Sequence, residues 1–126
     1  MVETIKRSLS GSVDGRQIKV VRTATAGTLI HTASGLDQTS HDEVWLYACN
    51  HHSGALILTI EFGGVDSPDD LIVKSLAVNS GAVEVIPGLI LTNGLVIRAF
   101  AGTGNLITIS GWVYRNPINS NLQYRT

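Results

Sequence analysis

The fold is decided by residues 43–62, which read EVWLYACNHHSGALILTIEF. Apolar side chains occupy every second position on either side of a short polar stretch, and this is the period of a strand buried on one face. The buried faces expected from this alternation are Val44, Leu46 and Ala48 in the first run, and Leu56, Leu58, Ile60 and Phe62 in the second. The pattern therefore predicts two β-strands separated by a polar loop.

Similar short runs, rich in Val, Ile and Thr, recur along most of the chain between Gly, Asn, Asp and Ser residues. No window has the apolar spacing of an amphipathic helix, so we expect no helix. Many short strands between turns are typical of an all-β antiparallel β-sandwich, here jelly-roll-like with about eight strands. The predicted strands are 17–23, 27–32, 43–50, 54–62, 70–78, 82–86, 95–101 and 106–114.

Turn residues and strand alternation make this prediction more specific. Asn93-Gly94 lies between two apolar runs, and both residues tolerate the positive φ of a two-residue hairpin turn. We also expect hairpin loops at 50–54 and 102–105, where polar residues separate strong strands. The predicted core between the two sheets includes Leu56, Leu58, Ile60, Ile107, Ile109 and Val113.

The length and composition fit one compact domain. The 126 residues are 44% hydrophobic, which is enough for a single core. We expect a β-sandwich domain at 17–115, between an N-terminal arm at 1–16 and a C-terminal tail at 116–126.

The charge content indicates which partners to expect. Charged residues make up only 15% of the chain, against about 25% in typical soluble proteins, and the net charge is -1. Such a chain has little self-repulsion, which favours assembly. There is no dense Lys/Arg cluster for nucleic acid and no apolar run long enough to span a membrane. The single Cys49 and the lack of an apolar secretion signal indicate synthesis in a reducing cytoplasm.

Several predicted strands carry large aromatic residues on the face opposite the predicted core. An antiparallel sheet in a monomer usually keeps one polar face. We therefore expect a second dry contact, formed by a neighbouring subunit or by a covering segment of the same chain. We expect a homotrimer, and the candidates for its subunit interface are Trp45, Tyr47, Phe100 and Trp112.

Few residues indicate catalysis or metal binding. His51 and His52 are adjacent, but they lie in a predicted turn, where polar residues collect in any case. The acidic stretch 66–70 lacks the ligand spacing of a helix-loop-helix calcium site. His31 is expected to be a partly buried strand residue with a hydrogen-bonded ring. We expect no enzyme activity, no cofactor and no metal site.

Five stretches resemble small virion proteins of tailed bacteriophages, in particular capsid decoration (cement) proteins of phages that infect cyanobacteria and other aquatic bacteria. They are 41–50, 58–64, 87–94, 98–101 and 107–113. The resemblance implies a sandwich or jelly-roll domain, often trimeric, on the capsid exterior of a virion assembled in the host cytoplasm. It also implies that the partner is the major capsid protein, which the domain clamps against the pressure of packaged DNA.

Within this interpretation the basic N-terminal segment is the candidate for contact with the capsid. The residues concerned are Lys6, Arg7 and Arg16, which are spaced by polar residues. Two other functions are compatible with the sequence. One is a carbohydrate-binding or host-attachment domain of a phage fibre, which requires aromatic side chains exposed beside polar loops. The other is a small hydrolase or metal-dependent enzyme, which only the His and Asp loops favour.

Overall fold

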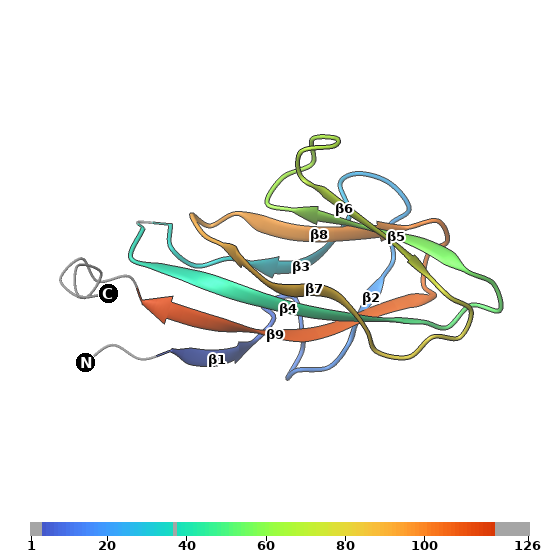
Figure 1. Cartoon of the computed structure of the whole chain (residues 1–126), viewed down its shortest axis with the longest axis horizontal. Helices are drawn as coiled ribbons and strands as arrows, with labels where there is room; N and C mark the ends of the chain where they lie inside the picture. Colours follow the sequence, from blue (N-terminus) through green and yellow to red (C-terminus); the bar gives the residue numbers. More distant parts are fainter. Residues whose placement is uncertain (1–3, 37, 118–126) are drawn as a thin grey trace.

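The computed structural model describes residues 4–36 and 38–117, and within these ranges the regular structure is entirely β. Figure 1 shows the strands along the chain. They are β1 (Ile5–Ser8), β2 (Ile18–Val20), β3 (Thr28–Thr32), β4 (Ser40–Asn50), β5 (Leu56–Phe62), β6 (Leu71–Leu76), β7 (Val83–Leu91), β8 (Val96–Ala101) and β9 (Ile107–Pro117). No helix suited to crossing a membrane occurs among the described residues.

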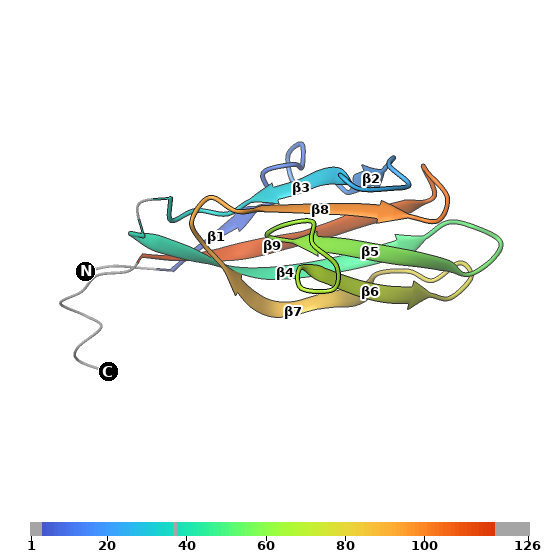
Figure 2. The ribbon, with the colours of Figure 1, turned by 90° about the horizontal axis from the view of Figure 1, so that it is seen from above.

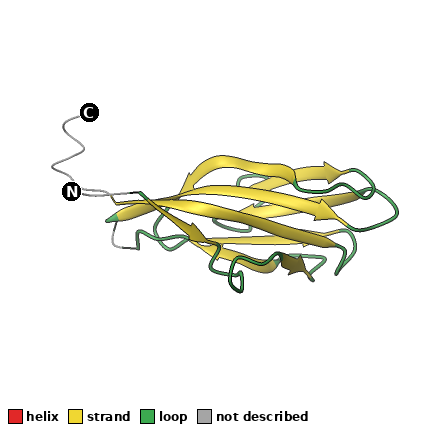
Figure 3. Cartoon of the chain, turned by 90° about the horizontal axis from the view of Figure 1, so that it is seen from below, coloured by secondary structure: helices red, strands yellow, loops and turns green. Residues whose placement is uncertain are grey.

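The strands form two antiparallel sheets that pack face to face (Figures 2 and 3). Sheet A has the order β1-β9-β4-β7, and β2 also pairs with β9 on the side taken by β1. Sheet B has the order β3-β8-β5-β6. The predicted all-β sandwich is therefore confirmed.

The core lies between the sheets, where the strand alternation placed it. All six predicted core residues are buried, and Leu58, Ile60, Ile107, Ile109 and Val113 have no exposed surface. Strand β4 contributes its even-numbered residues from Asp42 to Asn50, so the buried face includes a charged residue at one end and an amide at the other.

The three predicted hairpins are wrong, although the turns themselves are present. Asn93 and Gly94 both have positive φ, and the Leu95 N–H donates to the Thr92 carbonyl, but this turn leads from β7 in sheet A to β8 in sheet B. Loop 50–54 likewise leads from β4 to β5, and loop 102–105 leads from β8 to β9. Among the described strands, only β5 and β6 are both consecutive and paired.

The N-terminal segment is part of the sandwich rather than a free arm. Strand β1 pairs with β9, Leu9 is buried in the core, and the Gly11 N–H donates to the Ile30 carbonyl of β3. Residues 9–17 therefore leave sheet A after β1, contact the edge of sheet B at β3, and return to sheet A at β2. At the other end, 116 and 117 belong to β9, and the rest of the predicted tail lies outside the described residues, as do residues 1–3.

Candidate functional site

Three of the predicted interface residues lie together on the outer face of sheet A. Trp45 of β4 and Trp112 of β9 are cross-strand partners, with ring centroids 6.2 Å apart and ring planes 14° apart. Tyr47 stacks on Trp112 at 5.5 Å and 23°. Tyr114 lies two residues further along β9, on the same face. We call Trp45, Tyr47, Trp112 and Tyr114 the aromatic layer.

Lys6 also belongs to this face, although the sequence placed it with the capsid-contact residues. Its Nζ lies 4.7 Å from the centroid of the Trp112 ring and 5.8 Å from that of Tyr114, within the range of cation–π attraction. Since β1 and β4 lie on opposite sides of β9, Lys6 and Trp45 approach Trp112 from opposite sides. The Trp112 ring is therefore packed between its neighbours.

Polar contacts and a glycine hold the rest of the aromatic layer. The Trp45 Nε1–H donates to a Glu43 carboxylate oxygen at 2.7 Å, and the Tyr47 hydroxyl donates to Glu84 at 3.3 Å. Partial desolvation and the nearby Glu84 charge raise the pKa of Tyr47. On β7, a Cβ at Gly88 would lie 2.8 Å from the Trp45 ring, so the absence of a side chain at this position leaves space for the indole. The layer is half-buried and fixed before any partner arrives.

Phe100 does not belong to the aromatic layer. It lies on β8 in sheet B, opposite Thr59 of β5, and is half-buried. The single aromatic interface expected from the sequence is thus divided between the outer faces of two different sheets. The other two predicted capsid contacts, Arg7 on β1 and Arg16 in the 9–17 segment, are exposed and lie on the sheet edge that contains β1 and β2.

A covering segment of the same chain occupies part of the outer face of sheet B. Glu61 points outward from β5 yet has 0% exposure. It accepts hydrogen bonds from the Gly27 N–H at 2.7 Å and from the Thr25 hydroxyl. Arg98 adds a bond from its Nη1 to the Gly27 carbonyl at 3.3 Å. The β2–β3 connection therefore covers part of the outer face of sheet B.

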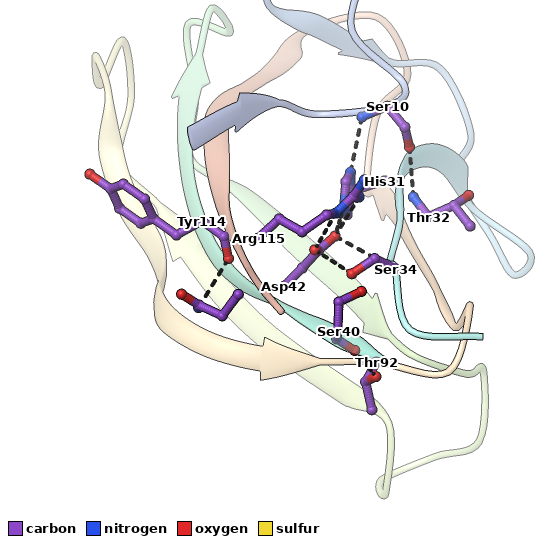
Figure 4. Close-up of polar contacts among 10 residues, drawn as sticks. Ser10, His31, Thr32, Ser34, Ser40, Asp42, Thr92, Tyr114 and Arg115 are labelled. Carbon is purple, nitrogen blue, oxygen red and sulfur yellow. Dashed lines mark hydrogen bonds and ion pairs between the residues drawn. The ribbon is translucent and has the colours of Figure 1, made fainter. Parts of the chain in front are cut away.

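A second buried carboxylate lies between the sheets. Asp42 of β4 has 0% exposure and accepts from Arg115 of β9 in a two-pronged pair, Nε to Oδ1 at 2.9 Å and Nη2 to Oδ2 at 3.0 Å (Figure 4). The Ser34 hydroxyl donates to Oδ1 at 2.7 Å, and the Ser34 N–H donates to Oδ2 at 3.2 Å. His31 of β3 completes the group, which we call the Asp42 cluster, with its Nε2 2.7 Å from Oδ2.

The hydrogen bonds of His31 show which of its two ring nitrogens carries the proton. The Ser10 backbone N–H donates to Nδ1 at 2.9 Å, so Nδ1 carries a lone pair and Nε2 carries the proton that faces Asp42. Burial lowers the pKa of His31 despite the neighbouring Asp42. Burial alone would raise the pKa of Asp42, but the hydrogen bonds from Arg115, His31 and Ser34 outweigh it and hold that pKa far below its usual range.

Ser10, His31 and Asp42 are the residue types of a hydrolase triad, but their geometry differs from one. Ser10 contacts the ring through its backbone N–H, while its hydroxyl oxygen accepts from the Thr32 N–H at 2.7 Å. His31 is only 1% exposed, so a substrate has no path to the ring. The Asp42 cluster joins β3, β4 and β9 across the two sheets and is structural in character.

The predicted loop histidines, His51 and His52, form hydrogen bonds with residues outside the Asp42 cluster. His51 Nε2 lies 3.1 Å from the Thr108 hydroxyl, and the His52 N–H donates to the Asn50 side chain. In the acidic loop, Asp70 accepts from the Asp66 N–H at 3.1 Å. The described residues contain no group of three or more His, Cys, Asp or Glu side chains arranged to hold a metal ion.

Stability should fall as the pH drops from 8 to 5, because His31 has a lowered pKa in the folded state. The unfolded chain takes up a proton near pH 6.5, whereas the folded ring resists it, so the unfolded state binds more protons below that pH. Asp42 adds to the loss only below about pH 4. Urea unfolding at both pH values measures the decline. In His31→Gln the decline in stability should be smaller. An equal decline in that variant would show that His31 does not cause it.

Comparisons of the chain with known proteins identify no relative. No protein-family model, no curated protein and no solved structure matches the chain. The features of this chain that bear on its function are the aromatic layer, the Asp42 cluster and the edges of the sheets.

Proposed function

We propose that the chain is a non-enzymatic virion structural protein, a decoration (cement) protein that binds the outer surface of an assembled phage head. The observation that carries this proposal is the aromatic layer on the outer face of sheet A, with Lys6 at one side and Glu43 and Glu84 at the other. Aromatic side chains fixed in advance lose little entropy on binding and are favoured at the centres of protein interfaces. The major capsid protein is the proposed partner.

The strand order supports the finer fold expected for such a protein. We infer a jelly roll, because β2-β9-β4-β7 faces β3-β8-β5-β6 and nearly every connection passes from one sheet to the other. Jelly rolls occur in viral capsid proteins and in lectins, so the fold is compatible with the proposal without proving it. Residues 41–50 and 107–113, which carry the phage resemblance, lie largely in the paired strands β4 and β9.

The proposed mechanism is thermodynamic. A domain that binds only the assembled shell stabilises that shell by mass action. Many copies, each bridging neighbouring capsid subunits, add their contributions through multivalency. The only chemistry required of the domain is a rigid contact face, and the Asp42 cluster supports that rigidity by joining β4 and β9 beneath the aromatic layer.

The alternative function, a carbohydrate-binding or host-attachment domain of a phage fibre, depends on the same aromatic residues but requires their ring faces to be open. Sugar rings stack on the open faces of aromatic side chains, whereas Trp112 has Lys6 on one side and Trp45 with Tyr47 on the other. A prearranged row of rings therefore favours a protein surface that packs against their outer edges.

Binding to shells tests the proposal directly. The purified chain should co-sediment with undecorated heads of the phage that encodes it. Trp112→Ala should weaken this binding at least about tenfold, since central aromatic anchors contribute 2 kcal/mol or more. Phe100→Ala, on the outer face of sheet B, is the matched control and should bind like the parent. Failure of the parent to sediment, or unchanged binding by a folded Trp112→Ala variant, would overturn the proposal.

A further inference from the structure

Residues 9–17 connect β1 to β2 and contact the edge of sheet B on the way, and we call them the strap. Its first residues are packed: Leu9 lies in the core with 1% exposure, and the Gly11 N–H donates to the Ile30 carbonyl at 2.9 Å. A Cβ at Gly11 would lie 2.6 Å from that carbonyl oxygen, so the strap approaches β3 closely here. Residues 13–17 are exposed. The hold of β3 on the strap is therefore concentrated at the start of the strap.

Ser10 supplies two further contacts between the strap and β3 (Figure 4). Its hydroxyl oxygen accepts from the Thr32 N–H at 2.7 Å, and its backbone N–H donates to Nδ1 of His31 at 2.9 Å. The second contact requires an unprotonated Nδ1, because a backbone N–H can donate a hydrogen bond but cannot accept one. A proton on Nδ1 would point at the Ser10 N–H. In this geometry, protonation of His31 and attachment of the Ser10 N–H exclude each other.

The surroundings of His31 favour the neutral ring that Ser10 requires. The charged groups that act on the ring are Asp42 of β4 and Arg115 of β9. Asp42 favours a proton on the ring, but its charge is already paired with Arg115 through two hydrogen bonds. On β8 the register partner of His31 is Ile97, which is uncharged. Burial of the ring outweighs the effect of Asp42, so the pKa of His31 is lowered while the strap is in place.

We propose that His31 and Ser10 form a proton-sensitive latch, in which uptake of a proton by His31 releases the strap from β3 while the two sheets stay packed. Release lets the ring reach water and regain a pKa near 6.5, so the open state binds a proton more tightly than the closed state. The fraction of open molecules therefore rises as the pH falls below about 6.5. Since β1 leads directly into the strap, the latch makes the attachment of the N-terminal strand depend on pH.

The latch differs from the loss of overall stability at low pH. That loss requires only that His31 has different pKa values in the folded and unfolded chains, whereas the latch adds an open state in which both sheets remain folded. Amides that open locally exchange with solvent faster than amides that open only on global unfolding. Exchange rates of single amides therefore separate the two events.

Hydrogen exchange of single amides, followed by NMR at pH 7.5 and 5.5, tests the latch without any partner. After correction for the intrinsic rate, the opening constants of the Ser10 and Gly11 amides should rise about tenfold, as expected for an open-state pKa near 6.5. At both pH values these amides should exchange at least about tenfold faster than those of Leu46 and Ile60, which lie in central strands.

Two histidine variants show whether the titrating group is His31. His31→Gln keeps a hydrogen-bond acceptor and a donor at the end of the side chain but cannot take up a proton. The opening constant of the Ser10 amide should then lose its pH dependence. His51→Gln is the matched control, because His51 is exposed, contacts Thr108 and should leave the tenfold change in place.

Gly11→Ala tests the coupling from the side of the strap. The added Cβ meets the Ile30 carbonyl and should hold the strap away from β3, so His31 should titrate at a higher pH than in the parent, as measured by NMR of its ring protons. Three results would overturn the latch. They are strap amides that exchange as slowly as the central-strand amides, an opening constant that changes less than about twofold between the two pH values, and an unchanged titration of His31 in Gly11→Ala.

Discussion

Replacing Asp42 with alanine is expected to lower the free energy of unfolding by about 3–5 kcal/mol, the range for breaking a buried charge pair from one side. The substitution removes the acceptor for Arg115, His31 and Ser34 together. His31 would then be left in the interior without its acceptor, and the partly exposed Arg115 and Ser34 would lose the partner that the fold provides. Urea unfolding at pH 7 measures the loss.

Two further variants keep this prediction testable if Asp42→Ala does not fold. Ser34→Ala removes only the hydroxyl donor and should cost about 1 kcal/mol. Asp70→Ala is the control, because Asp70 accepts from the Asp66 N–H in a surface loop and should change stability by no more than about 0.5 kcal/mol. A cost below about 1 kcal/mol for Asp42→Ala would mean that the Asp42 cluster does not stabilise the sandwich.

Ile109→Ala should cost about 2–5 kcal/mol, because it leaves a cavity in a packed aliphatic core. Ile109 has no exposed surface, lies on β9 and is the register partner of Ala48 on β4 and of Ile18 on β2. Val73→Ala on β6, where the side chain is 61% exposed, is the matched control and should stay within about 0.5 kcal/mol. Similar values for the two variants would contradict the placement of Ile109 between the sheets.

Strand alternation was enough to predict most of the fold, and its failures have local causes. All eight predicted strands are present, but the sequence predicts an arm in place of β1 because Ile5–Ser8 is short and half charged. The second half of β7 was missed because Pro87 and Gly88 interrupt it, and the register against β4 shifts at this point. Such residues suit an edge strand, which β7 is.

The sequence located the aromatic layer better than it located the buried charges. Alternation predicts that Trp45 and Tyr47 share a face, but only the distant pairing of β9 with β4 brings Trp112 to them. The pairing of β8 with β5 instead places Phe100 in the other sheet, which alternation does not predict. Extending the alternation of Val44 and Val113 outward would have placed Asp42 and Arg115 on the buried side. Burial of Glu61 could not be predicted, since it depends on where the β2–β3 connection lies.

The position of β9 in sheet A has a consequence for how the protein is made. β9 is synthesised after the other eight described strands, yet it lies between β4 and the pair β1 and β2. During translation β4 therefore lacks the partner that covers its whole length, from Ser40 to Asn50, until residues 107–117 leave the ribosome. Sheet A must then close late, through contacts between distant parts of the chain, which is a slow step. The nascent chain meanwhile exposes a long apolar strand edge, and a chaperone that shields β4 would raise the yield of folded protein.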